Sequence, residues 1–194
     1  LLQMVNDPDF ELTRAADVIG RDTALVLELL KMVNRMTVNN GITTIRHAAA
    51  MLGQKELKRW INTAVTKELC SDKPNEITRL SLLRAKFAED LAPLYDLKIK
   101  SSELFLMGLF SVLDIILDMP MADALDKVNV SKDIFTALVH HDGALAPVMD
   151  LVTQYENANW QEVSRLMMVR EQDTDEVYRA YINAVRWYRD VFYA

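Results

Sequence analysis

The stretch "ITRLSLLRAKFAEDLAPLYD", residues 77–96, carries the longest helical pattern in the chain. Apolar residues recur in it at intervals of three and four positions, the spacing that gives an α-helix one buried face. Pro93 stands near its end, and proline cannot continue a helix interior. The stretch therefore predicts a long core helix that kinks or stops at this proline.

The same spacing recurs on both sides of this stretch, and no tract alternates apolar and polar residues as a half-buried strand would. Only five glycines and five prolines occur among 194 residues. Before the stretch, a short helix closed by Gly53 is followed at once by a helix over 54–70; after it, a single helix is expected from Ser101 or Ser102 to Leu117. These patterns predict an all-α, compact domain of about eleven helices.

No low-complexity linker and no repeat of fixed period divides the chain. We therefore expect one domain over residues 1–194, with a helical N-terminal half over about 1–72 and a C-terminal half over about 75–194. The chain starts inside an apolar pattern without an initiator methionine. This start predicts a fragment of a longer protein with an upstream domain.

Composition narrows the classes of partner. The 22 basic residues are outnumbered by 28 acidic ones, giving a net charge of −6 without any long basic run. Nucleic acid is therefore not expected as a partner. No apolar run reaches the length of about 18 residues that a membrane span needs, so no membrane partner is expected. The single cysteine, Cys70, excludes an internal disulfide and suits a reducing, cytoplasmic location.

The sequence "HHD", residues 140–142, raises the question of a metal centre, because a His-Asp pair is how HD-type phosphohydrolases present two adjacent ligands. The third histidine, His47, lies 94 residues before His141. Neighbouring histidines point about 100° apart on a helix, so His140 and His141 cannot both face one ion. Asp142 stands before glycine, where an aspartate is ordinary turn chemistry. We expect no metal and no other cofactor.

The first half of the chain resembles the HDOD domain, a relative of the HD phosphohydrolases. The likeness rests on "LVLELLKMVNRM" (25–36) and "GITTIRHAAAMLGQKELKRWI" (41–61). The positions that match the family pattern are Asn34, Ile45, Ala49, Leu52, Gly53, Leu57 and Trp60. Arg35 replaces the usual serine.

The second half is similar to the HDOD domains that follow EAL domains in bacterial two-domain signalling proteins. The pieces that carry this likeness are "LLRAKFAEDLA" (82–92), a long segment over 103–139, "LVTQYENANWQEV" (151–163) and "AVRWYRD" (184–190). As a set they cover most of residues 10–190.

The resemblance also places the positions where an HD protein holds its metal. The His-Asp ligands would fall in "MGLFSVLD" (107–114), at Ser111 and Val112, and the earlier histidine would fall near Leu83 or Arg84. Because other residues occupy both places, the resemblance implies that the chain is not an enzyme, since an activated water would be missing.

The resulting expectation is a cytoplasmic signal-transduction module that regulates an attached or partner domain in cyclic di-GMP signalling. Its expected partners are an upstream EAL-type domain, another signalling protein or a second copy of the chain. Two alternatives stay open: a metal-dependent phosphohydrolase with an unconventional site at His141, and a nucleotide-sensing domain that uses Arg84. The candidate interaction or pocket residues are Asn34, Arg35, Trp60, Arg84 and Glu89.

Overall fold

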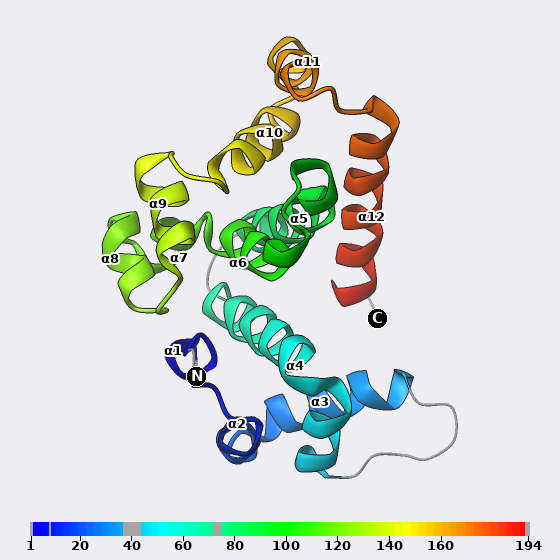
Figure 1. Cartoon of the computed structure of the whole chain (residues 1–194). Coiled ribbons are helices and arrows are strands. Elements are labelled where there is room, and N and C mark those ends of the chain that lie inside the picture. Colours follow the sequence, from blue (N-terminus) through cyan, green and yellow to red (C-terminus); the bar gives the residue numbers. More distant parts are fainter. Residues whose placement is uncertain (1, 8, 37–43, 72–74, 193–194) are drawn as a thin grey trace. The chain divides into compact units, whose positions relative to one another are not determined.

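The computed structural model describes residues 2–7, 9–36, 44–71 and 75–192, and helices make up most of these ranges (Figure 1). Within the described residues there are twelve α-helices, two short 3-10 helices and no strand. The all-α prediction is confirmed, with one α-helix more than the roughly eleven expected. Among the helices of these ranges, none is long and apolar enough to cross a membrane.

The chain divides into two compact units, Leu1–Glu68 and Leu69–Ala194. The first unit holds α1 (Leu2–Val5), α2 (Leu12–Ile19), α3 (Thr23–Met36) and nearly all of α4 (Ile45–Leu69). Its core consists mainly of fully buried aliphatic side chains, among them Ile19, Leu29, Val33, Leu57 and Ile61. The expected division into halves of a single domain stays a prediction.

Gly53 interrupts α4. Its φ of 73° and ψ of 173° are far from helical values, so α4 consists of two helical segments joined at this glycine. A residue with a side chain would be strained at this positive φ, whereas glycine adopts it readily. The predicted boundary at Gly53 is therefore confirmed.

Three polar side chains of α4 hold the N-terminal segment of the first unit. Gln54 donates to the carbonyl of Phe10 at 2.9 Å, and Lys58 donates to the carbonyl of Asp7 at 3.3 Å. Asn62 and Asn6 exchange two amide hydrogen bonds of 3.2 and 3.3 Å. Positions 54, 58 and 62 follow one another at intervals of four, so they lie on one face of the helix. Desolvation lowers the pKa of Lys58, with the charge of Asp7 acting against that shift.

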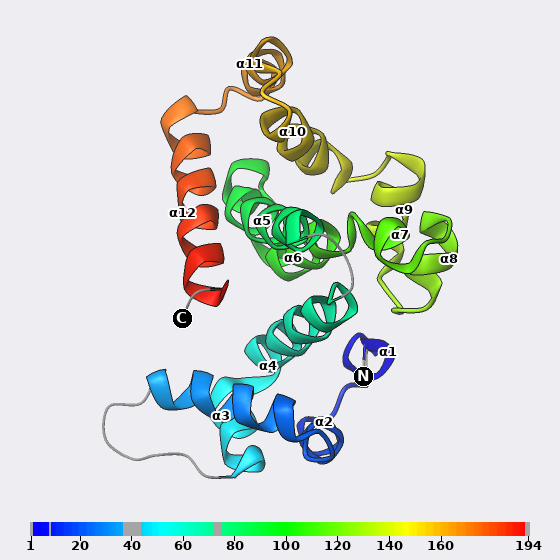
Figure 2. The same cartoon turned by 180° about the vertical axis from the view of Figure 1, so that it is seen from behind.

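The second unit contains the remaining helices. They are α5 (Asn75–Leu91), η1 (Ala92–Tyr95), η2 (Lys98–Lys100), α6 (Ser101–Phe110), α7 (Leu113–Leu117), α8 (Met121–Asp126), α9 (Lys132–His140), α10 (Ala146–Glu156), α11 (Trp160–Val169) and α12 (Thr174–Phe192). Within this unit, α5 and α6 run together at the centre, with α12 on one side and α7 to α9 on the other (Figures 1 and 2). α5 makes its most extensive contacts with α6 and α12.

The end of α5 confirms the stop predicted at Pro93, whereas the end of α6 corrects the single helix expected over 101–117. α5 stops at Leu91, and Pro93 lies in the first turn of η1, as the proline predicts. The single helix expected over 101–117 is wrong, because it breaks at Ser111 and Val112 into α6 and α7. The Ser111 hydroxyl donates to the carbonyl of Gly108 at 2.8 Å, a local bond that competes with helix continuation.

Gly108 lets α6 approach α5 at backbone distance. A Cβ atom at this position would overlap the carbonyl group of Arg84 and would lie 2.5 Å from the backbone nitrogen of Ala85. Both obstacles are backbone atoms of the facing helix, which cannot rotate away as a flexible side chain can. The closeness of the two central helices therefore depends on glycine at residue 108.

We expect Gly108→Ala to destabilise the chain by about 2 kcal/mol or more, because overpacking typically costs about 1–3 kcal/mol. This cost exceeds the gain of about 1 kcal/mol in helix propensity. Urea unfolding followed by circular dichroism measures the change, and Ser102→Ala at an exposed position of α6 is the matched control. Equal stability of the Gly108 variant and the wild-type chain would contradict the close-approach argument.

Candidate functional site

Arg84 of α5 joins three helices of the second unit. Its Nε and Nη2 atoms each donate to a carboxylate oxygen of Glu156, at the end of α10, over 2.8 Å. Its Nη1 atom donates to the Ser111 hydroxyl, at the break between α6 and α7, over 3.1 Å. The side chains of Arg84 and Glu156 are only 15% and 27% exposed. We call Arg84, Ser111 and Glu156 the arginine link.

The backbone places this link. Gly108 sets the spacing of α5 and α6, and the break after α6 turns the Ser111 hydroxyl toward Arg84 while it also bonds back to Gly108. Val112, next in the chain, is buried at 2% exposure, and Leu83 packs partly buried against the core of the second unit. Of the four positions where the resemblance predicts the HD ligands, the structure brings Arg84 and Ser111 into direct contact.

A set of aromatic rings borders the link on its α10 side. Tyr155, next to Glu156, lies 5.3 Å from the buried Phe87 ring, 4.9 Å from Tyr181 and 5.2 Å from Trp160, measured between ring centroids. Burial raises the pKa of the Tyr155 phenol above its ordinary value, and the nearby tyrosines 181 and 178 add to this effect. These contacts join α5, α10, α11 and α12 and hold the end of α10 in place.

The charges of the link are mutually satisfied. The Glu156 carboxylate neutralises the Arg84 guanidinium through two hydrogen bonds, and the Ser111 hydroxyl accepts a third N–H of the same guanidinium. An anionic ligand at Arg84 would therefore have to compete with Glu156. The arrangement is suited to holding helices together, and any nucleotide binding there requires the ion pair to open first.

The other candidate residues are placed elsewhere. Glu89 pairs with Lys86 of its own helix, at 3.0 Å between Oε2 and Nζ, and the same ammonium contacts Asp90 at 2.6 Å. Trp60 is partly buried against the core of the first unit. Asn34 and Arg35 belong to the last turn of α3, and their side chains lie outside the described residues.

The histidines take positions at helix ends and on exposed faces. His141 caps α9 in the left-handed conformation with φ of 53°, and His140 lies 5.9 Å from the Phe135 ring. The Asp142 carboxylate accepts the backbone N–H of Gly143 at 2.7 Å. Among the described residues, no group of three or more His, Cys, Asp or Glu side chains is arranged to hold a metal ion.

Sequence reasoning missed Glu156. The reason is that 72 positions separate Glu156 from Arg84, which is far beyond the reach of a spacing rule within one helix. One signal was present: a glutamate that ends a helix faces the negative end of the helix dipole, which disfavours a carboxylate unless a cation lies nearby. That signal predicts a basic partner without naming it.

Comparisons with known proteins identify the family. A family model of the HDOD domain matches residues 1–134. The chain belongs to the HDOD family. The protein named cyclic di-GMP phosphodiesterase CdgJ, from Vibrio cholerae, is 32% identical over 98% of this chain. The uncharacterized protein YuxH, from Bacillus subtilis, is 28% identical over 96% of it. No solved structure matches the chain.

This HDOD chain spans less than half the length of the curated relatives it matches, 45% of the Vibrio protein and 46% of the Bacillus protein. The phosphodiesterase name of the first relative contradicts our expectation that the chain is not an enzyme. That expectation was wrong because replaced ligands exclude only the chemistry of one metal centre. They leave open every other route to hydrolysis.

A double-mutant cycle tests the arginine link. Arg84→Met and Glu156→Gln should each lower the free energy of unfolding by about 1–3 kcal/mol, because each leaves a half-buried charged or polar group without its partner. The double variant should lose less than the sum of the single losses, since both changes remove the same interaction. Chemical denaturation of the four proteins gives the coupling energy.

The pair Arg165 and Glu162 of α11 is the matched control, because it has the same bidentate geometry at a more exposed position. Solvent screening should leave no measurable coupling there. A coupling energy at Arg84 and Glu156 no greater than that of the control would show that the arginine link does not contribute to the stability of the fold.

Proposed function

We propose that this HDOD chain serves in cyclic di-GMP turnover, within a protein that hydrolyses cyclic di-GMP at a rate that the HDOD region adjusts. The observation that carries the proposal is the Vibrio relative, which is named a cyclic di-GMP phosphodiesterase and whose likeness covers 98% of this chain. We further propose an EAL-type domain or another signalling protein as the partner that receives this adjustment, as the resemblance of residues 82–190 implies.

The second unit offers a physical means of adjustment. The arginine link ties α5, the α6–α7 break and the end of α10 by one set of charge-assisted hydrogen bonds. Packed helices have few intermediate arrangements, because displacing one of them opens voids or creates overlaps. Opening the arginine link would therefore move the end of α10 between two discrete positions. A domain that contacts this region would then meet a different surface in each of the two states.

Deletion of residues 1–194 from the full-length gene product should change its rate of cyclic di-GMP hydrolysis several-fold, and Arg84→Met should change it in the same direction. The measurement is loss of cyclic di-GMP and appearance of its linear product, with kcat and KM determined separately. Arg165→Met serves as control and should leave both constants unchanged.

The outcomes separate the parts of the proposal. An intact protein that does not hydrolyse cyclic di-GMP would exclude the turnover role. Hydrolysis with constants unaffected by the deletion would exclude rate adjustment. The same assay on residues 1–194 alone shows whether this chain itself cleaves the nucleotide, which would place the reaction in the HDOD region.

A further inference from the structure

α12 carries a second apolar stripe on the side opposite the core. Its inner face buries Val177, Ala180 and Ala184 in the core of the second unit. Tyr178, Ile182, Val185 and Arg189 recur at intervals of four, three and four on another side of the helix, where Tyr178 is 55% and Val185 37% exposed and Ile182 is half-buried. A helix that only closed a core would carry polar residues at positions 178, 182 and 185.

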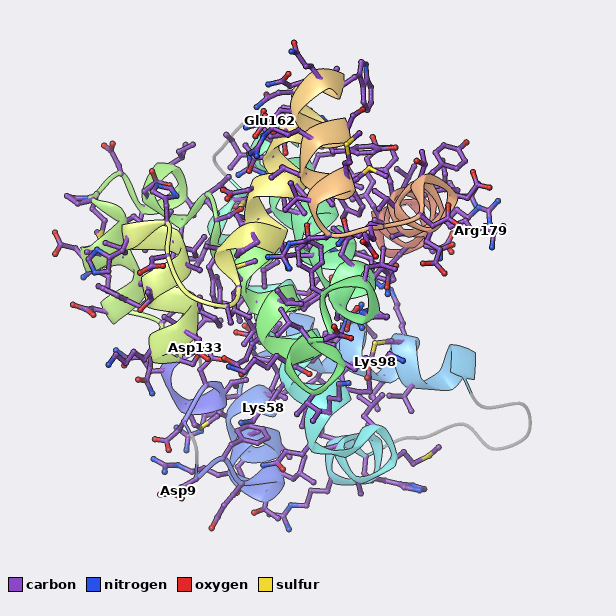
Figure 3. All side chains as sticks on the ribbon, turned by 45° about the horizontal axis from the view of Figure 1, so that its top comes forward. Asp9, Lys58, Lys98, Asp133, Glu162 and Arg179 are labelled. Atoms are coloured by element: carbon purple, nitrogen blue, oxygen red, sulfur yellow. The ribbon has the colours of Figure 1, made fainter. Side chains whose placement is uncertain are left out.

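The ends of this outer stripe carry opposite charges. Asp175 lies in the first turn of α12, and Arg189 lies in the last turn, where its neighbour Asp190 is a well-exposed partner at 3.4 Å. Arg186 precedes this last turn, and Arg179 flanks the stripe, pointing away from the rest of the second unit (Figure 3). The stripe therefore runs from the acidic Asp175 through three apolar side chains to the basic Arg189, with Arg179 as a basic neighbour in its first half and Asp190 as an acidic one at its end.

From this self-complementary pattern we infer that α12 is a pairing surface for a second copy of the chain, with the two α12 helices antiparallel. A two-fold axis at Ile182 brings this residue against its own copy and places Tyr178 opposite Arg186 and Asp175 opposite Arg189. The two Ile182 side chains then meet at the axis, Val185 lies opposite Arg179, each acidic end faces a basic end, and the helix dipoles oppose one another. Arg186 over the Tyr178 ring adds a cation–π contact.

A second copy of the chain fits this surface better than a partner of unrelated sequence, because the same helix supplies both the acidic and the basic end of the contact. The expected strength is modest, since a single pair of helices buries less area than a standard stable interface. We expect a dissociation constant in the range of about 10–500 µM. This inference does not depend on the role in cyclic di-GMP turnover, so either can fail without the other.

Sedimentation velocity of the full chain over a concentration series tests the pairing. The wild-type chain should pass from monomer to dimer, and Ile182→Glu should weaken dimerisation at least tenfold, because it places two carboxylates at the two-fold axis. Asp175→Arg and Arg189→Asp should each weaken it by setting like charges opposite one another. The double variant, in which both charges are exchanged, should restore it.

Asp123→Arg is the matched control, since Asp123 is an exposed acid in the first turn of α8 and makes the same change of net charge. Circular dichroism of every variant verifies that the helices are intact. A wild-type chain that stays monomeric throughout, a dimer that persists in Ile182→Glu, or a double variant that pairs no better than the single ones would each overturn the inference.

Discussion

The close approach of α5 and α6 at Gly108 is the constraint on which the second unit depends. With backbone atoms of Arg84 and Ala85 directly beneath residue 108, the two helices have one register in which they fit. That register sets Arg84 beside Ser111, and α5 also packs extensively on α12. The arginine link therefore follows from a missing side chain as much as from the polar groups that form it.

Much of this fold was predictable from the chain because its rules are local. Intervals of three and four positions identify the helices, Pro93 ends α5, and Gly53 divides α4, each through the backbone of one residue. The break at Ser111 was not predictable in this way. Its surroundings favour a continuous helix, and the interruption requires a hydroxyl that bonds to Gly108 while it accepts a donor from another helix.

In the candidate site, too, the contacts that depend on distant parts of the chain were the ones that could not be predicted. Family resemblance pointed to Arg84 and Ser111, and the structure brings them into contact. Glu156 completes the link, yet its position depends on how α10 returns to α5 after 72 residues, which no spacing rule encodes. The candidate Glu89 lies on the same helix as Arg84, but the structure pairs it with Lys86, three positions away.

The position of α12 connects the arginine link with the outer stripe. α12 packs extensively on α5, the helix that carries Arg84, and Tyr181 of α12 shares the aromatic contacts that border Glu156. Since close-packed side chains leave little free volume, α12 cannot move without repacking of Phe87 and Tyr155. A partner bound to the stripe would thus act on the same rings that hold the end of α10, which makes contacts between helices the route by which association could affect the site.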